Sequence, residues 1–364
     1  MAIYKIFPEK SATLYSFYPT INTGLDEILE ISTFTSINDT NEVSRAIILF
    51  PSDEINDIIN NKVSGSTYDA YLKLYLANAS SLPVNYTLYC NPISGSWEGG
   101  TGRLANVPAT TDGASWGNRD QLSGTTWFNG TFPTNTTGSF KSGSNSGGGL
   151  WYTGSYESTQ SFSRSTSKDI ELKVSTTVNA WVSSSIRNNG LIIKHSPTTE
   201  FTSQSKFETK YFSGNTHTIY PPCLEIRWND SSYITGSLTI VTSDKITAGI
   251  INNKDKFNQD SVQRFRINVR DQFPARSFQT TSVYLNNKLL PITSYWSIKD
   301  LDTEEIVIDY DTSYTKISAD GTGNYFDLYM NGLEPERNYK VLIKTIINNN
   351  TLILDNNYYF KVIR

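Results

Sequence analysis

Histidine and cysteine, two residue types that catalysis and metal binding commonly use, are rare and widely spaced in this sequence. The chain has 364 residues and only two histidines, His195 and His217, which are not spaced as a pair of metal ligands. The segment GGTGR at 99–103 resembles a phosphate-binding loop, but it lacks the Lys-Ser/Thr ending and a preceding buried strand. We therefore expect both histidines to be ordinary surface or rim residues.

Acidic residues of the C-terminal third form a second candidate, because glycoside hydrolases use a pair of carboxylates. The closest groups in the sequence are Asp302, Glu304 and Glu305, and Asp309 and Asp311. Apolar and polar residues alternate around them, which predicts the solvent face or a turn of a β-sandwich. Oxygen-rich turns at 22–30 and 311–324 leave a structural calcium ion open, although neither has EF-hand spacing. We expect no enzymatic activity and no cofactor.

Short runs of alternating apolar and polar residues recur along the chain, and a period of two predicts β-strands. In the N-terminal two-thirds these runs are 3–7, 12–17, 28–34, 45–50, 70–76, 85–91, 169–175, 190–195, 206–212 and 222–228. Helical spacing is confined to 52–63 and 176–186. From residue 262 the alternation becomes regular, with turns between six or seven strands, as in immunoglobulin or fibronectin-type sandwiches. The sequence thus predicts an all-β protein.

Composition and charge narrow the function further. Aromatic residues make up 13% of the chain and the net charge is −4, so there is no basic footprint for nucleic acid. No apolar segment is long enough to span a membrane, and the N-terminus lacks the basic start and apolar run of a secretory signal. For the only cysteines, Cys90 and Cys223, a disulfide stays open, and two buried free thiols are the simpler interpretation.

A Gly/Ser/Thr-rich segment at about 92–168 interrupts the strand pattern. It carries tryptophans that a solvated linker would not contain, which are Trp97, Trp116, Trp127 and Trp151. These four tryptophans and Tyr152 are the candidate contacts for a partner or a glycan. Trp97 and Trp116 either pack on the rim of a sandwich or form an exposed platform for sugars. Trp151 and Tyr152 follow a glycine-rich arm, and we expect this pair to be buried at a contact with another subunit or partner.

The N-terminal two-thirds resembles DNRLRE-type domains, which are jelly-roll modules similar to carbohydrate-binding modules. The resemblance covers residues 11–228 and depends on the order of several short motifs. Its matching residues are Asn22 and Gly24 in an Asn-x-Gly turn, Arg45 and Phe50 in an R-x-x-L-x-F element, and Asn188, Gly190 and Lys194 in N-x-G-L-I-I-K. It implies a jelly-roll domain at 1–229 with a long insertion, a connector at 230–261, and an immunoglobulin-like sandwich at 262–364.

A second resemblance concerns virion structural proteins of tailed bacteriophages. The segments that carry it are SWEGGTGR, TTDGASWGNRD and NYFDLYMNGLEPERNYKV. It implies a non-enzymatic component of the neck, tail or baseplate, made in the host cytoplasm and present as a homo-oligomeric ring or in multiple copies. Its partners would be other virion proteins. The alternative is a carbohydrate-binding or host-adhesion module.

Overall fold

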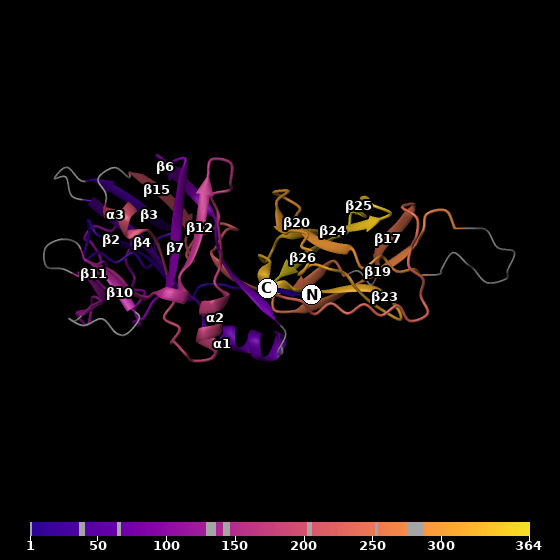
Figure 1. Cartoon of the computed structure of the whole chain (residues 1–364), viewed down its shortest axis with the longest axis horizontal. Coiled ribbons are helices and arrows are strands. Elements are labelled where there is room, and N and C mark those ends of the chain that lie inside the picture. The colour runs from indigo at the N-terminus through magenta and orange to yellow at the C-terminus, as the bar shows by residue number, and fades with distance from the viewer. Residues whose placement is uncertain are drawn as a thin grey trace. The chain divides into compact units, whose positions relative to one another are not determined.

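The computed structural model describes residues 2–35, 41–63, 67–128, 136–140, 146–201, 206–251, 254–274 and 287–364 (Figure 1). Strands make up 48% of the chain and helices 9%, which confirms the all-β prediction. The chain divides into two compact units. We call Ile6–Lys62 with Asp69–Glu225 the N-terminal unit, and Met1–Lys5, Val63–Tyr68 and Ile226–Arg364 the C-terminal unit. The predicted N-terminal domain at 1–229 included residues 2–5, 63, 67–68 and 226–229, which belong to the C-terminal unit.

One large antiparallel sheet organises the N-terminal unit. Its strands, in spatial order, are β12 (Ser158–Ser163), β7 (Asn85–Pro92), β14 (Leu191–His195), β4 (Asn41–Leu49), β3 (Ile28–Thr35), β15 (Phe207–Phe212) and β6 (Leu76–Ser80), and β2 (Lys10–Tyr15) also pairs with β4. β4 and β14 lie inside this sheet, and β14 is buried along its whole length. A strand buried on both faces has no room for a solvated charge, so any charged side chain on it needs a partner inside the protein.

Smaller elements complete this unit. β5 (Tyr68–Leu74) pairs with β13 (Ile170–Lys173), and the insertion contributes β8 (Asn118–Asp120), β9 (Thr125–Thr126), β10 (Thr136–Phe140) and β11 (Ser146–Tyr152). The helices are α1 (Ser52–Asp57), which continues as the π-helical turn Ile58–Val63, α2 (Ser175–Val182), α3 (Pro197–Phe201) and the 3-10 turn Gly154–Tyr156. The two helical patterns of the sequence therefore correspond to α1 with its extension and to α2.

Two sheets form the C-terminal unit, beside β1 (Ala2–Ile6) and the C-terminal half of β16 (Cys223–Trp228). The first has the order β17 (Ile246–Ile251), β19 (Val262–Asp271), β23 (Gly323–Tyr329) and β22 (Ser318–Asp320). The second has β18 (Lys256–Asn258), β26 (Tyr359–Ile363), β24 (Asn338–Ile347), β20 (Ser294–Asp300) and β21 (Ile306–Ile308), while β25 (Asn350–Leu354) pairs with β24. A 3-10 turn, Met330–Gly332, follows β23. β18 and β26 are parallel, and the other pairs are antiparallel.

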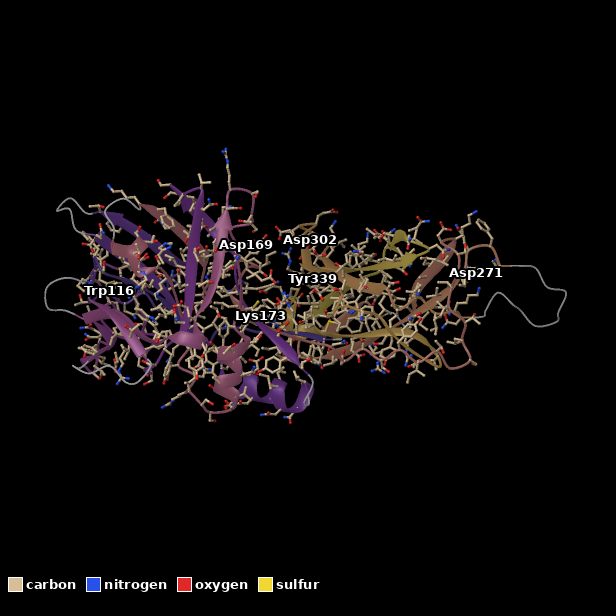
Figure 2. The ribbon with its side chains drawn as sticks, viewed as in Figure 1. Trp116, Asp169, Lys173, Asp271, Asp302 and Tyr339 are labelled. Carbon is tan, nitrogen blue, oxygen red and sulfur yellow. The ribbon has the colours of Figure 1, made fainter. Side chains whose placement is uncertain are left out.

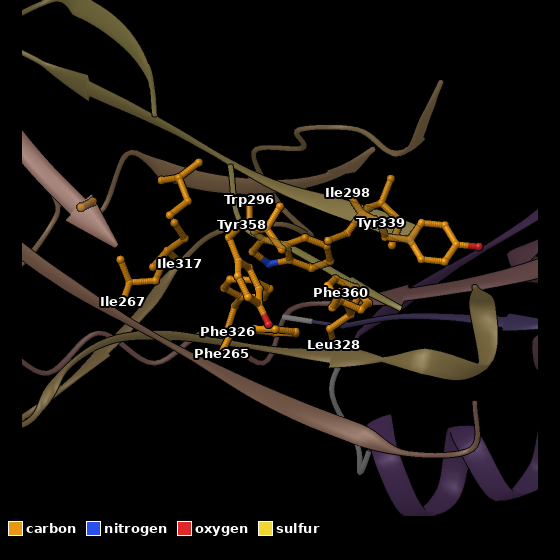
Figure 3. Close-up of a cluster of buried hydrophobic side chains, with 14 of the residues drawn as sticks. Phe265, Ile267, Trp296, Ile298, Ile317, Phe326, Leu328, Tyr339, Tyr358 and Phe360 are labelled. Atoms are coloured by element: carbon orange, nitrogen blue, oxygen red, sulfur yellow. The ribbon is translucent and has the colours of Figure 1, made fainter. Parts of the chain in front are cut away.

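Aromatic side chains from both sheets build the core of the C-terminal unit (Figure 3). β24 buries every second residue, as its alternating sequence predicts. The Trp296 ring stacks on Phe326 with centroids 5.0 Å apart, and Phe265 stacks on the same ring at 5.1 Å. Stacked rings add to the stabilisation from their buried area, so this unit has an ordinary sandwich core of its own. No helix among the described ranges is both long and apolar enough to cross a bilayer.

Candidate functional site

A buried ion pair lies at the centre of the candidate site in the N-terminal unit. Arg45 Nε donates to Glu200 Oε1 at 2.9 Å, and Nη2 donates to Oε2 at 2.7 Å. The side chains are 0% and 1% exposed. Arg45 is on β4 and Glu200 on α3, so the pair joins a central strand to a short helix 155 residues further along the chain. The bidentate geometry pairs the two guanidinium N–H groups with the two carboxylate oxygens, and this offsets the cost of burying both charges.

Two indole rings cover the Arg45 guanidinium. Its centre lies 4.9 Å from the ring of Trp116 and 5.1 Å from that of Trp151, and Trp116 is labelled in Figure 2. Arg45 Nη1 also donates to the Gly148 carbonyl at 2.6 Å. Gly148 has φ +75°, and a Cβ there would lie 2.6 Å from the Trp116 ring and 2.7 Å from Nη1. Glycine is therefore required for the backbone to approach the arginine.

Lys194 is a second buried basic side chain in the same cluster. It is 2% exposed, and its Nζ lies 4.8 Å from the Trp151 ring and 5.3 Å from the Tyr89 ring. Burial lowers the pKa of Lys194, and the positive charge of Arg45 acts in the same direction. The site thus holds two basic side chains against aromatic faces.

The four tryptophans of the insertion are all buried. Their exposed fractions are 2% for Trp97, 3% for Trp116, 4% for Trp127 and 3% for Trp151, and all four belong to one hydrophobic cluster. Trp97 Nε1 donates to the Asn189 carbonyl at 2.9 Å, and Trp127 Nε1 to the Ser115 carbonyl at 2.8 Å. A sugar platform needs open ring faces, so in this structure these indoles act as packing residues.

Trp151 and Tyr152 differ in exposure. Trp151 is covered by Arg45 and Lys194 of its own unit. Tyr152 is half-buried and makes an edge-to-face contact with Tyr156 at 6.0 Å. Their contact with another subunit stays a prediction. Of the two side chains, only Tyr152 is partly exposed to solvent in the single chain.

Asn22 holds the loop between Trp97 and Trp116 in place. Its Nδ2 donates to the carbonyls of Gly99 and Ala114, both at 2.8 Å, and its Oδ1 accepts from the Gly102 and Gly24 amides at 2.8 and 3.1 Å. The Asn22 side chain of the Asn-x-Gly match therefore joins its own turn to the segments around Gly99–Gly102 and Ala114. Beyond it, Asp112 accepts from Thr101 and Arg103 pairs with Glu27 at 3.3 Å.

The second Asn-x-Gly match serves a similar purpose. Asn188 Nδ2 donates to the carbonyl of the fully buried Phe50 at 2.9 Å, and its Oδ1 accepts from the Gly190 amide at 3.0 Å. Gly190 has φ +91°, and a Cβ there would lie 2.3 Å from the Ile48 carbonyl oxygen. All seven residues of the motif resemblance thus have structural roles within one unit.

The two histidines differ from each other, and the expectation for His195 was wrong. His217 is 85% exposed and lies 3.9 Å from Glu27. His195 is fully buried on β14 and packs on the Phe207 ring at 4.3 Å. The continuous apolar run of β14 could have shown this, because such a strand is buried on both faces. Burial lowers the pKa of His195 to about 3.

We expect acid to destabilise the protein through His195. The unfolded-state pKa is near 6.5, so between pH 6.5 and 3 the unfolded chain binds a proton that the folded chain excludes. The stability from neutral His195 is fully present above pH 6.5 and is lost as the pH falls. The free energy of unfolding should drop by about 2 kcal/mol between pH 7 and pH 5.

Urea denaturation at the two pH values measures this drop. His195→Gln should remove most of it, whereas His217→Gln, at an exposed position, should leave it unchanged. Equal pH dependence in the two variants would contradict the assignment to His195.

Two of the acidic candidates, Glu304 and Asp311, are engaged in local contacts, and so is Asp320 in the oxygen-rich turn 311–324. Glu304 accepts from Lys299 at 2.6 Å, Asp320 pairs with Arg266 at 2.7 Å, and Asp311 Oδ1 accepts from backbone amides of its own turn. In the portion of the chain that the structure describes, no three His, Cys, Asp or Glu side chains are grouped to hold a metal ion.

Sequence reasoning missed Asp300. This 1% exposed carboxylate accepts from Arg337 Nε at 2.6 Å and Nη2 at 2.9 Å. Burial alone would raise the pKa of Asp300, but the hydrogen bonds from Arg337 and from backbone amides hold it below its usual range. Its strand, Ser294–Asp300, is almost wholly buried, and an acid at the end of such a strand is the signal that was available.

One segment, GASWG at 113–117, has the G-x-S-x-G pattern of serine hydrolases. That motif requires a strand–turn–helix context with an exposed serine. Here Ser115 is fully buried, its Oγ bonds to Gln121 Oε1 at 3.1 Å, and the segment leads into β8. Its carbonyl receives the Trp127 indole, so the segment is part of the loop packing.

Both cysteines are free and buried. Burial raises the pKa of Cys90 to about 12, so its thiol stays protonated at neutral pH. In the Arg45 cluster, by contrast, the charged and aromatic side chains contact one another, and these contacts hold the long insertion on the large sheet.

Comparison with known proteins found no match, so the function has to be inferred from the sequence and this geometry. No protein-family model matches the chain, and neither a curated protein nor a solved structure matches it.

Proposed function

We propose that the chain is a non-enzymatic structural component of a tailed-phage virion, which joins or decorates the neck, tail or baseplate through protein–protein contacts. The observation that carries the non-enzymatic part is that the buried groups of the Arg45 cluster are bound to one another. Arg45 donates three hydrogen bonds, two to Glu200 and one to the Gly148 carbonyl. The two indole rings that cover it, Trp116 and Trp151, belong to the same unit. A group enclosed in this way serves the fold and not a substrate.

An exposed aromatic surface on the N-terminal unit supports the contact part of the proposal. Phe17, Tyr18 and Phe34 are 49%, 41% and 40% exposed. Phe17 lies 4.7 Å from the Tyr18 ring and 6.2 Å from the Phe34 ring. Large exposed apolar side chains that gather in one place are typical of protein interfaces. We assign this surface to a neighbouring virion protein.

The virion assignment itself comes from the sequence resemblance. The carbohydrate-binding alternative requires open aromatic faces, and the burial of Trp97 and Trp116 supports the structural proposal over it. The structural proposal needs no open ring at these positions.

Complementation of a phage that carries a stop codon early in this gene tests the proposal. Without the chain, particles should lack a neck, tail or baseplate feature and lose infectivity, and the wild-type chain supplied in trans should restore both. The double variant Phe17→Ala, Phe34→Ala should fold but fail to restore them. Phe273→Ala, at a 74% exposed position of the other unit, should restore them fully. Normal, infectious particles without the chain would overturn the proposal.

A further inference from the structure

Lys194 is a buried amine without a carboxylate partner. Among the described residues, its Nζ has one hydrogen-bond acceptor, the His195 carbonyl at 3.5 Å, and no ion pair. Glu200, a buried acid of the cluster, is held by Arg45. An ammonium group buried without a hydrogen-bonded carboxylate is costly, so burial favours deprotonation of Nζ to the nucleophilic amine more than it would at an exposed lysine. The lowered pKa of Lys194 agrees with this.

Asn91, on the neighbouring strand, is buried and only partly satisfied. Its side chain is 0% exposed, and Oδ1 has no hydrogen-bond partner among the described residues. Nδ2 donates to the Tyr152 carbonyl at 3.1 Å and to Glu157 Oε2 at 3.3 Å. The amide nitrogen of Asn91 is thus already in contact with an acid.

The register of β7 and β14 places these two side chains on one face. Lys194 is opposite Tyr89, and Asn91 is opposite Ile192, two residues along the same antiparallel pair. Successive residues of a strand point to opposite faces, so Asn91 shares the face of Tyr89 and Lys194. Diagonal neighbours are about 7 to 8 Å apart, which long side chains can span.

Other contacts join the same groups. Trp151 lies against Lys194 while the adjacent Tyr152 carbonyl accepts from Asn91, so one segment covers both side chains. The charge of Glu157 acts on Lys194 as well as bonding to Asn91. The strand pairing and the Trp151–Tyr152 segment therefore connect a buried amine and a buried primary amide, and the carboxylate of Glu157, an exposed residue, reaches the amide.

We propose that Lys194 and Asn91 form an intramolecular isopeptide bond. The neutral Nζ attacks Cγ of Asn91, the new N–C bond forms, and the Cγ–Nδ2 bond breaks. Glu157 takes a proton from Nζ and delivers one to Nδ2, which leaves as ammonia. The step involves no oxidation and needs no further reactant. The bond would tie β7 to β14 covalently in the middle of the large sheet, a strengthening that goes beyond the proposed assembly role.

Intact-mass spectrometry of the full chain, denatured and reduced, tests this directly. The mass should be lower than that of the sequence by one ammonia molecule. Asn91→Ala and Lys194→Met should each have the full mass of their sequences, and digestion of the wild type should yield a branched peptide joining the two strands. Glu157→Gln should retain the ammonia, whereas Glu171→Gln, an acid on β13, should lose it as the wild type does.

Loss of ammonia by cyclisation of an asparagine on its own backbone gives the same mass change, and the variants separate the two. Pro92 follows Asn91 and has no amide hydrogen, so Asn91 cannot react in this way. Cyclisation elsewhere would persist in Lys194→Met. A wild-type chain at its full sequence mass, or a loss that persists in Lys194→Met, would overturn the proposal.

Discussion

Glu200→Gln should lower the free energy of unfolding of the N-terminal unit by about 3 to 5 kcal/mol. The substitution keeps the shape of the side chain but leaves the fully buried Arg45 guanidinium without a counter-charge. Breaking a buried ion pair at one partner costs more than the intact pair contributes, because the remaining charge loses the carboxylate that offset its desolvation. Urea denaturation followed by tryptophan fluorescence measures the change, since five of the seven tryptophans lie in this unit.

Glu27→Gln is the matched control. Glu27 also pairs with an arginine, Arg103, at 3.3 Å, but both side chains are almost half exposed. Exposed pairs contribute about 0 to 1 kcal/mol, so this variant should unfold almost as the wild type does. Similar losses in Glu200→Gln and Glu27→Gln would contradict the structural importance of the buried pair.

Trp116→Ala should destabilise the same unit by about 3 to 5 kcal/mol. The indole is 3% exposed, covers the Arg45 guanidinium, and lies within the tryptophan cluster, so its removal opens a cavity and uncovers a buried cation. Trp97→Ala should have an effect of similar size for the same reason. Leu122→Ala, at an 85% exposed position, should change stability by no more than about 0.5 kcal/mol.

A glycan-binding assay on the same proteins distinguishes packing from recognition. If Trp116→Ala kept the wild-type melting temperature and lost binding to a polysaccharide, the indole would be a ligand platform and the packing assignment would be wrong. Loss of stability without any such binding in the wild type is the expected result.

Local periodicity predicted much of the fold, because a strand with one buried face shows that face directly in the sequence. β24 is the clearest example, with every second residue buried. The two helical patterns were also predicted. Ile55 and Ile58 in the first, and Val178 and Trp181 in the second, are three residues apart and buried. The all-β class follows from such short-range signals.

The candidate site could not be predicted in the same way, because its partners are distant in sequence. Arg45 and Glu200 are separated by 155 residues, and although Arg45 directly precedes the apolar run 46–50, nothing near it in the sequence identifies Glu200 as its partner. His195 was misjudged because polarity suggested the surface, while the strand around it is buried on both faces. The tryptophans were correctly singled out as unusual for a linker, but only the three-dimensional arrangement shows that they cover Arg45 and Lys194.

Quantitative mass spectrometry of purified particles, washed at high salt, tests the central claim most directly. If the chain is a structural component, its peptides should be present at a constant number of copies per particle, and that number should fit the symmetry of a neck, tail or baseplate ring. Absence of the chain from washed, infectious particles, or a variable trace amount, would contradict the claim.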